Sequence, residues 1–253
     1  MLLRAENLTR HFGGVSALEA VDVELARGAV HAVIGPNGAG KTTLLNVLSG
    51  VYRAHTGRIF LDGTELTSRA SHEFAAAGVS RTFQNLQIFF NMTALENVMV
   101  GRWLHSRSSL ACTLLRLPSF GKVEQECRAA AGALMEEVGL ARWLGARADA
   151  MPYGALKRLE IARALAAEPK LLLLDEPAAG LNPSETREID ELIRKIAARG
   201  ITVVLVEHNM KLVMGVAAHV IVLDYGRKLA EGEPRAVSGD ARVIEAYLGT
   251  GAA

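Results

Sequence analysis

The stretch GPNGAGKTT, residues 35–43, decides the fold of this chain. Gly35, Gly40, Lys41 and Thr42 stand where the phosphate-binding loop pattern G-x-x-x-x-G-K-[ST] requires them. Glycines let the backbone curl until successive N–H groups point inward and form a nest for an anion. A helix expected from about Lys41 adds the positive end of its dipole. The sequence therefore predicts a nucleotide-phosphate site made by Gly35, Pro36, Asn37, Gly38, Ala39, Gly40, Lys41, Thr42 and Thr43.

The residues around this loop indicate an α/β fold. Four short runs are uniformly apolar, as strands of a parallel sheet are when both faces are buried: residues 29–35, 170–176, 201–208 and 219–226. Segments of helical character separate them. The alternating segments VDVELARG (21–28) and RIFLDGTEL (58–66), the second with an Asp62-Gly63 turn, predict a small antiparallel sheet beside the parallel one.

A second motif, LLLLDEP (171–177), completes the predicted site. A buried strand would deliver Asp175 to the carboxyl edge of the sheet, where ligands bind in open α/β sheets. We expect Asp175 and the Thr42 hydroxyl to bind Mg²⁺, Lys41 to reach the β- and γ-phosphates, and Glu176 to polarise an attacking water. An apolar run ending in Asp-Glu is also how a solvated strand end looks. Its pairing with the phosphate loop favours the functional reading.

Composition narrows the class of protein. The chain has 253 residues, half of them hydrophobic, and a net charge of +1, which does not suggest a nucleic-acid binder. Two cysteines, Cys112 and Cys127, and a start without a secretory pattern favour a reduced cytosolic setting. No run approaches the roughly 18 apolar residues that span a bilayer. Any membrane role is expected to come through a partner.

The order of five motifs resembles the ATP-binding subunit of ABC transporters. They are GPNGAGKTT (35–43), RTFQN (81–85), YGALKRLEIARAL (153–165), LLLLDEP (171–177) and LVEHN (205–209). The resemblance covers essentially the whole chain and implies ATP and Mg²⁺ as ligands. It also implies a RecA-like, phosphate-loop NTPase core with a mainly parallel sheet, an antiparallel β subdomain and an inserted α-helical subdomain.

This resemblance divides the single domain 1–253 into parts. We expect residues 1–85 and 151–225 to form the ATP-binding core with its antiparallel subdomain. Residues 86–150, which lack clear strand runs, are expected to form the helical subdomain. Residues 226–253 are expected to be a C-terminal extension.

The resemblance also assigns roles to single residues. Phe12 matches the aromatic that stacks on adenine, although a lone Phe could equally belong to the core. Gln84 matches the glutamine that touches Mg²⁺ or water, and His208 matches the histidine that contacts the γ-phosphate. Tyr153 and Gly154 open the helix whose amino end points at the ATP of a second subunit, where the anion itself acts as the cap.

The signature helix departs from the general LSGGQ form of the family. Pro152 stands in place of Ser and Ala155 in place of Gln, and only Gly154 is retained. Proline has neither a hydroxyl nor an N–H group, so two potential phosphate donors are absent. We expect weaker ATP binding between subunits.

The motif-flanking segments resemble the importer branch for branched-chain and other hydrophobic amino acids. Relatives for urea and short amides, or for lipopolysaccharide export, remain alternatives, as do a non-transport ABC ATPase and a kinase or GTPase that shares only the phosphate loop. Implied partners are transmembrane permease subunits, a copy of this chain or a second ABC ATPase, and indirectly a substrate-binding protein, with no nucleic acid. The implied location is peripheral, on the cytoplasmic face of the inner (plasma) membrane.

The stretch between Asn97 and Val123 is basic and contains no acidic residue. A solvated, partly helical loop explains this composition. The alternative is a surface that faces the permease or anionic lipid head groups. The four residues concerned are Arg102, Arg107, Arg116 and Lys122.

Overall fold

The computed structural model describes residues 1–105 and 118–248. Predictions that fall on Arg107, Cys112 and Arg116 lie outside the described residues. The chain forms two compact units: unit 1 comprises Met1–Arg81 and Lys170–Ala253, and unit 2 comprises Thr82–Pro169. No helix in the described ranges has the length and apolarity to cross a membrane.

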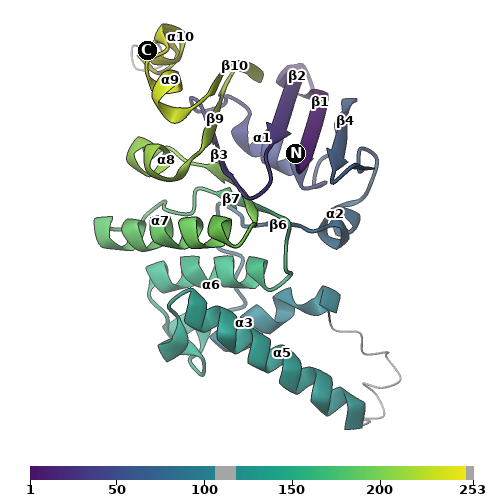
Figure 1. Ribbon diagram of the computed structural model, residues 1–253, viewed down its shortest axis with the longest axis vertical. Helices are drawn as coiled ribbons and strands as arrows, with labels where there is room; N and C mark the ends of the chain where they lie inside the picture. The colour runs from purple at the N-terminus through teal and green to yellow at the C-terminus, as the bar shows by residue number, and fades with distance from the viewer. Residues whose placement is uncertain (106–117, 249–253) are drawn as a thin grey trace. The chain divides into compact units, whose positions relative to one another are not determined.

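Unit 1 contains a six-stranded sheet with the order β10-β9-β3-β8-β7-β6 (Figure 1). Neighbouring strands are parallel except β10, which is antiparallel to β9. The four apolar runs form β3, β7, β8 and β9, which confirms the predicted parallel sheet. The strands are β3 (Val30–Ile34), β6 (Val79–Arg81), β7 (Leu171–Asp175), β8 (Thr202–Val206), β9 (His219–Asp224) and β10 (Arg227–Gly232).

A second, antiparallel sheet of unit 1 has the order β2-β1-β4-β5. Its hairpin between β4 and β5 turns at Asp62 and Gly63, whose φ angles of 53° and 78° are those of the expected tight turn. The predicted antiparallel sheet is thus confirmed. Its strands are β1 (Leu3–Phe12), β2 (Val15–Leu25), β4 (Thr56–Leu61) and β5 (Thr64–Glu65).

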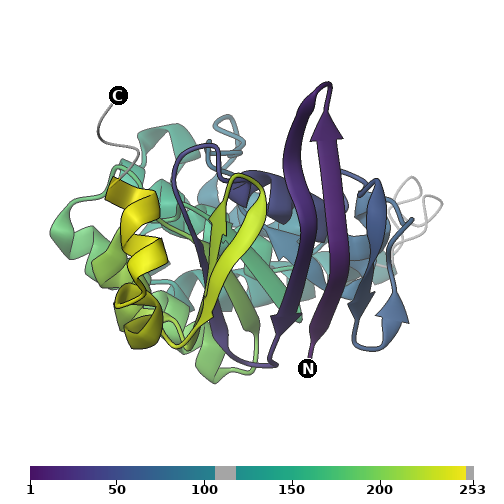
Figure 2. The same cartoon turned by 90° about the horizontal axis from the view of Figure 1, so that it is seen from above.

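Helix α1 (Lys41–Leu48) packs between the two sheets of unit 1 (Figures 1 and 2). Its apolar residues share one core cluster with Leu3 of the antiparallel sheet and Val33 of the parallel sheet. The neighbours of Val33 in β3, Ala32 and Ile34, point into a second cluster on the opposite face. Burial on both faces explains why β3 is uniformly apolar.

Among the remaining helices of unit 1, α2 contributes Phe74 to the same cluster as α1. Ile189, Ile193 and Ile196 form the buried side of α7, and Val213, Val237 and Val243 bring α8, α9 and α10 into the second cluster. The helices are α2 (Ser71–Ala77), α7 (Pro183–Ala198), α8 (Met210–Val216), α9 (Pro234–Ser238) and α10 (Ala241–Leu248).

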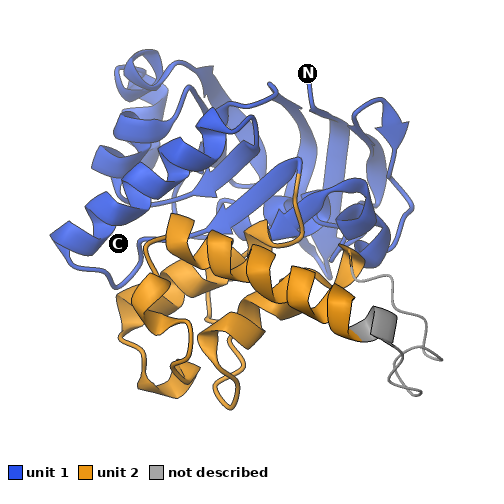
Figure 3. Cartoon of the chain, turned by 60° about the horizontal axis from the view of Figure 1, so that its bottom comes forward, with its two compact units in different colours: residues 1–81, 170–253 blue, residues 82–169 orange. Residues whose placement is uncertain are grey.

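Unit 2 is helical in its described part (Figure 3). Helices α3 and α6 approach closely at Gly101, where a Cβ atom would stand 2.1 Å from the carbonyl oxygen of Arg163. Three short turns of 3₁₀ helix join the longer elements. These elements are α3 (Ala94–Gly101), η1 (Trp103–His105), α5 (Pro118–Glu137), η2 (Ala141–Trp143), η3 (Ala148–Ala150) and α6 (Tyr153–Leu165).

The compact unit is longer than the predicted helical subdomain 86–150. It includes α6, which the sequence places in the ATP-binding core, because α6 packs against α3 and α5. The backbone N–H of Phe83 donates to the Glu160 carboxylate, so the first residues after β6 also join this unit. The functional division of the chain stays a prediction.

Candidate nucleotide-binding site

The predicted phosphate-loop and hydrolysis residues of unit 1 gather at one edge of the parallel sheet. Strand β8 lies between β3 and β7, and its Val206 is in register with Val33 on one side and Asp175 on the other. The three strands therefore end level. Ligands of open α/β sheets bind at this carboxyl edge. It brings together the phosphate loop after β3, Glu176 after β7 and His208 after β8.

The phosphate loop ends in an uncapped helix. Gly40 is the N-cap residue of α1, with a left-handed φ of 100° and no side-chain hydrogen bond to the helix. A Cβ atom at this position would lie 2.4 Å from the carbonyl oxygen of Ala17, so the position requires glycine. The first N–H groups of α1 are left without a side-chain cap, which suits an anion.

Lys41 lies folded over this loop. Its side chain is buried, and Nζ donates to the carbonyl oxygens of Gly35 at 2.7 Å and Pro36 at 2.8 Å. Burial lowers the pKa of Lys41, while the negative charges of Glu176 and Asp175 oppose that shift. Phosphate oxygens are better partners for an ammonium group than two neutral carbonyls. The arrangement thus has a cation ready for an anionic ligand.

The Mg²⁺ donors predicted within unit 1 fit that ion chemically. Asp175 is almost fully buried at the end of β7, and Thr42 is exposed in the first turn of α1. A carboxylate and a hydroxyl are the oxygen ligands that Mg²⁺ accepts, with phosphate oxygens and water completing its shell. Among the described residues there is no cluster of three His, Cys, Asp or Glu side chains that could hold a metal alone. A metal shared with a phosphate ligand agrees with this sparse set.

Glu176 has an unusual backbone conformation. Its φ is 51°, a left-handed value that is uncommon for residues other than glycine. Its N–H donates to the Val206 carbonyl oxygen at 2.9 Å, which fixes the turn after β7 against β8. The carboxylate Oε1 lies 2.9 Å from Nε2 of His208. The partly exposed imidazole and the more buried carboxylate thus form a pair at the sheet edge.

Two residues of this edge were not predicted from the sequence. Arg81 ends β6 and forms an ion pair with Asp175, with Nη2 and Oδ2 3.0 Å apart. Glu207 precedes His208, and its buried carboxylate accepts the N–H groups of Ala178 at 2.9 Å and His208 at 3.1 Å. Glu207 therefore ties the loop after Glu176 to the histidine segment. Arg81 is the first residue of the motif RTFQN and Glu207 lies in the motif LVEHN, so their place in these motifs was the sequence feature that could have identified them.

Phe12 is not a core residue. It lies at the end of β1 with 40% of its surface exposed. Tyr52 packs against it edge-on, with ring centroids 5.3 Å apart, and the Arg10 guanidinium lies 4.8 Å from the centroid of the Phe12 ring. An exposed, supported aromatic ring is suited to stacking on a flat ligand.

The other predicted site residues belong to unit 2. Gln84 lies there in the segment before α3, and its carbonyl oxygen accepts a hydrogen bond from Lys157 at 3.4 Å. Helix α6 starts after Pro152, an N-cap without a side-chain hydrogen bond. Tyr153 is 45% exposed and Gly154 is buried. The amino end of α6 thus lacks a side-chain cap, as the sequence predicts, and the phosphate roles of these residues stay predictions.

The described part of the basic stretch also lies in unit 2. Arg102 donates to the Glu168 carboxylate at 2.9 Å, so one of the four basic residues of the stretch has an acidic partner within unit 2. Lys122 is exposed in α5. Cys127 is a free cysteine.

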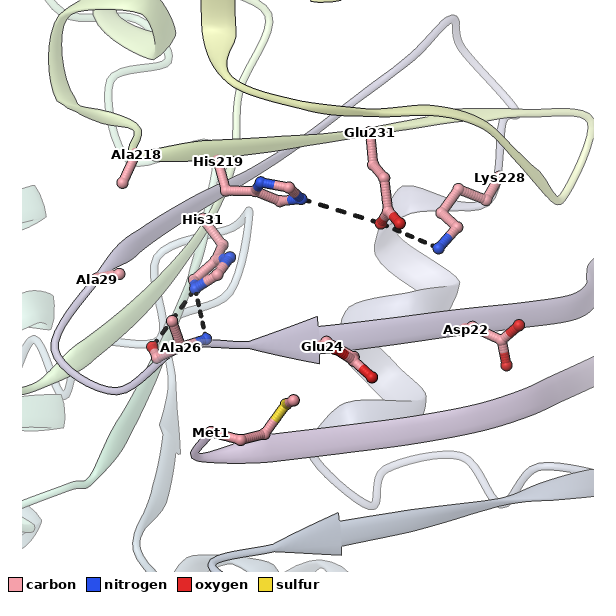
Figure 4. A pocket seen from close by; sticks show the side chains of 10 residues that line it. All are labelled: Met1, Asp22, Glu24, Ala26, Ala29, His31, Ala218, His219, Lys228 and Glu231. Carbon is pink, nitrogen blue, oxygen red and sulfur yellow. Dashed lines mark hydrogen bonds and ion pairs between the residues drawn. The ribbon is translucent and has the colours of Figure 1, made fainter.

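A separate hollow of unit 1 lies at the opposite ends of the strands (Figure 4). It has a volume of about 650 Å³ and lies beside the starts of β3 and β9, whereas the phosphate loop follows the carboxyl end of β3. His31 is buried there, and its Nε2 accepts the N–H of Ala26 at 3.0 Å. Burial lowers the pKa of His31, and the charge of His219 lowers it further, while the Ala26 carbonyl oxygen, 3.4 Å from Nε2, opposes the shift.

Comparison with known proteins gives consistent matches along the chain. Residues 18–179 match the sequence model of the family described as ABC transporter. Residues 227–253 match the model described as branched-chain amino acid ATP-binding cassette transporter. The chain is 42% identical over 249 residues to the high-affinity branched-chain amino acid transport ATP-binding protein BraF of Pseudomonas aeruginosa, covering 98% of each protein. It is 41% identical to the corresponding protein LivG of Escherichia coli, again with 98% of each covered.

Solved structures of ATP-binding cassettes from ABC transporters resemble this chain along nearly its whole length. A nucleotide-free ATP-binding cassette from an ABC transporter superposes with a TM-score of 0.85 at 33% identity, covering 97% of this chain and 98% of that one. An ATP-binding cassette in its ADP conformation gives a TM-score of 0.84 at 33% identity, with 98% of each chain covered.

Proposed function

The chain belongs to the ABC transporter family of ATP-binding cassettes, and on that basis we propose that it powers an importer of branched-chain or other hydrophobic amino acids. It is an ATPase, and the coupling of that activity to uptake is the proposal. The observation that carries the choice of substrate is the match of residues 227–253, because this segment lies outside the common ATPase core. The names of the relatives BraF and LivG support the same substrate class.

ATP binding rests on the phosphate loop. The loop N–H groups and the amino end of α1 hold the β- and γ-phosphates, and Lys41 leaves the carbonyl oxygens of Gly35 and Pro36 for them. The exposed ring of Phe12 stacks on adenine. Thr42, Asp175 and Gln84 would hold Mg²⁺, which when bound neutralises negative charge on the phosphates.

Hydrolysis is assigned to the pair at the ends of β7 and β8. Glu176 accepts a proton from the attacking water as its oxygen bonds to the γ-phosphorus, and the bond from that phosphorus to the ADP oxygen breaks. His208 fixes the orientation of the Glu176 carboxylate through their contact of 2.9 Å and faces the γ-phosphate. The charged groups are thus in place before the reaction.

Transport follows from closure of two ATPase subunits over ATP. Each ATP lies between Lys41 of one chain and the Gly154 helix end of its partner, which is a copy of this chain or a related ATPase. Closure moves the helical parts and, through them, the permease subunits. Loss of the γ-phosphate removes the anion between the subunits, and they separate. The protein acts at the cytoplasmic face of the membrane as a peripheral subunit.

Uptake by the assembled transporter tests this function. The chain is co-expressed with candidate permease subunits and a candidate binding protein, and membrane vesicles are assayed for uptake of labelled leucine, isoleucine and valine, with labelled urea as comparison. We expect ATP-dependent uptake of the three amino acids, and its loss with the Lys41→Ala chain. Uptake of urea without leucine would replace the proposed substrate class. Equal leucine uptake with Lys41→Ala would remove this ATPase from the transport cycle.

A further inference from the structure

A single arginine links the two elements of unit 1 that carry the predicted metal ligands. The side chain of Arg81 is only 6% exposed, and its Nη2 lies 3.0 Å from Oδ2 of Asp175, whose side chain is 1% exposed. Its other terminal nitrogen, Nη1, donates to Oδ1 of Asn46 at 2.6 Å and to Oγ of Ser49 at 3.3 Å. The guanidinium thus joins strand β7 to helix α1.

Sheet order explains how Arg81 reaches this place. Strand β6 pairs with β7, and Arg81 is opposite Leu173, two residues before Asp175 on the same strand. On α1, Asn46 stands four residues after Thr42, so both lie on the same side of the helix. Arg81 therefore lies between the carboxylate and the helix face that are predicted to bind Mg²⁺.

The positive charge of Arg81 affects both the buried Asp175 carboxylate and any metal ion bound to it. A carboxylate as buried as Asp175 is costly unless a cation compensates it. The structure shows an ion pair between Asp175 and Arg81, whereas Lys41 has its Nζ on the Gly35 and Pro36 carbonyl oxygens and acts on Asp175 through its charge. A metal ion at Asp175 would place two further positive charges beside the guanidinium, and like charges in a buried site repel strongly.

Arg81 also holds the Asp175 carboxylate in place, and this effect would favour Mg²⁺ binding. Asp175 is, however, fixed independently, because β7 pairs with β8 up to Asp175 itself. Loss of Arg81 is therefore expected to strengthen Mg²⁺ binding, because the repulsion between the guanidinium and the metal disappears while Asp175 stays in place.

We propose that Arg81 is the resident counter-ion of Asp175, which stabilises this carboxylate in the metal-free protein and weakens the binding of Mg²⁺ there. The inference rests on the proposed function in assigning Mg²⁺ to Asp175. Release of metal and product then leaves a site that is already neutralised, so the open form needs no ligand to remain folded. Arg81 is a positioning residue, since it acts through Asp175.

Thermal unfolding in EDTA tests the counter-ion role without any metal. Arg81→Met is expected to lower the melting temperature by about 5–15 °C, because it removes the ion-pair partner of a buried charge. Arg81→Lys keeps the charge and is expected to recover most of this loss. The double variant Arg81→Met with Asp175→Asn is expected to melt clearly above Arg81→Met alone. Arg27→Met removes a pair with Asp62 that is exposed, and serves as the control with a shift of roughly 2 °C or less.

Binding of a fluorescent ADP analogue at varied Mg²⁺ concentration tests the second part. Arg81→Met is expected to lower the half-saturating Mg²⁺ concentration by about tenfold or more, and Arg81→Lys to leave it near that of the unmodified chain. A double variant that melts no higher than Arg81→Met in EDTA, or a higher half-saturating Mg²⁺ concentration for Arg81→Met, would overturn the inference. Should Arg81→Met not fold, Arg81→Gln replaces it in both measurements. Mg²⁺-independent ADP binding by the unmodified chain would contradict the proposed metal site, while the EDTA comparison still decides the counter-ion role.

Discussion

His208 Nε2 lies 2.9 Å from Glu176 Oε1, so the ends of β8 and β7 are joined by side chains at the edge where the phosphate loop lies. This contact predicts that His208 acts more in hydrolysis than in nucleotide affinity. His208→Ala is expected to lower the ATPase rate by roughly 100-fold, as loss of one preorganised group does, with a much smaller loss of ATP affinity. Rates and equilibrium binding are measured on the same preparation. His219→Ala, at the opposite ends of the strands, is the control, and an ATPase loss of equal size in both variants would contradict the assignment.

Lys41 is predicted to be required for nucleotide binding. Its charge is buried over the phosphate loop, where Nζ donates to the carbonyl oxygens of Gly35 and Pro36. Lys41→Ala should weaken ATP binding by about 100-fold, equivalent to about 3 kcal/mol for a charged hydrogen bond. Titration calorimetry measures it, with Lys195→Ala on the exposed side of α7 as control. Unchanged affinity in Lys41→Ala would place the phosphates elsewhere.

Much of this site could be predicted from the sequence because its residues follow buried strands. The runs before Gly35 and Asp175 are apolar throughout, so they identify central strands and, with them, the edge at which their last residues meet. His208 also follows a buried strand, β8, but its role was assigned from the resemblance to the ABC transporter family. Local patterns were therefore enough for the phosphate loop and Asp175, and the order of the family's motifs was needed for His208.

Arg81 and Glu207 depend on neighbours that are distant in sequence. Strand β6 has three residues and no apolar run, so its pairing with β7, which brings Arg81 to Asp175, has no local sign. Glu207 is buried because its carboxylate accepts an N–H group from Ala178 on another strand's loop. A charged residue at a strand end reads as solvated until the partner is known.

His31 predicts a pH dependence of stability. Its pKa is lowered by burial in the folded chain, whereas the unfolded chain binds a proton below about pH 6.5. Between the two pKa values the unfolded state holds more protons, so stability falls as the pH falls below about 6.5. The melting temperature of His31→Gln should drop less between pH 7 and pH 5 than that of the unmodified chain. Exposed His72→Gln is the control, and equal drops in all three proteins would exclude His31 as the source.

Pro152 predicts a gain of affinity between subunits. It is the N-cap of α6 with φ of −68° and gives the helix end no side-chain cap, whereas a serine there would add a hydroxyl donor. A charge-assisted hydrogen bond contributes about 1.5–3 kcal/mol, more than the roughly 0.4–1 kcal/mol lost by relaxing one proline. Pro152→Ser in the Glu176→Gln background should lower the ATP concentration for half-maximal dimer in sedimentation. An unchanged or higher value would mean that the backbone alone completes this helix end.

The most direct measurement compares ATP hydrolysis and ATP-dependent association in Glu176→Gln. Glutamine keeps the shape of Glu176 but cannot take a proton from water, so binding should persist while turnover falls by roughly 100-fold or more. ATP then remains bound, and the account predicts a closed dimer with two ATP molecules in sedimentation, absent with ADP. A Glu176→Gln protein that hydrolyses ATP at a near-normal rate, or that stays monomeric with saturating ATP, would contradict the assignment of Glu176 and of the ATP-driven closure.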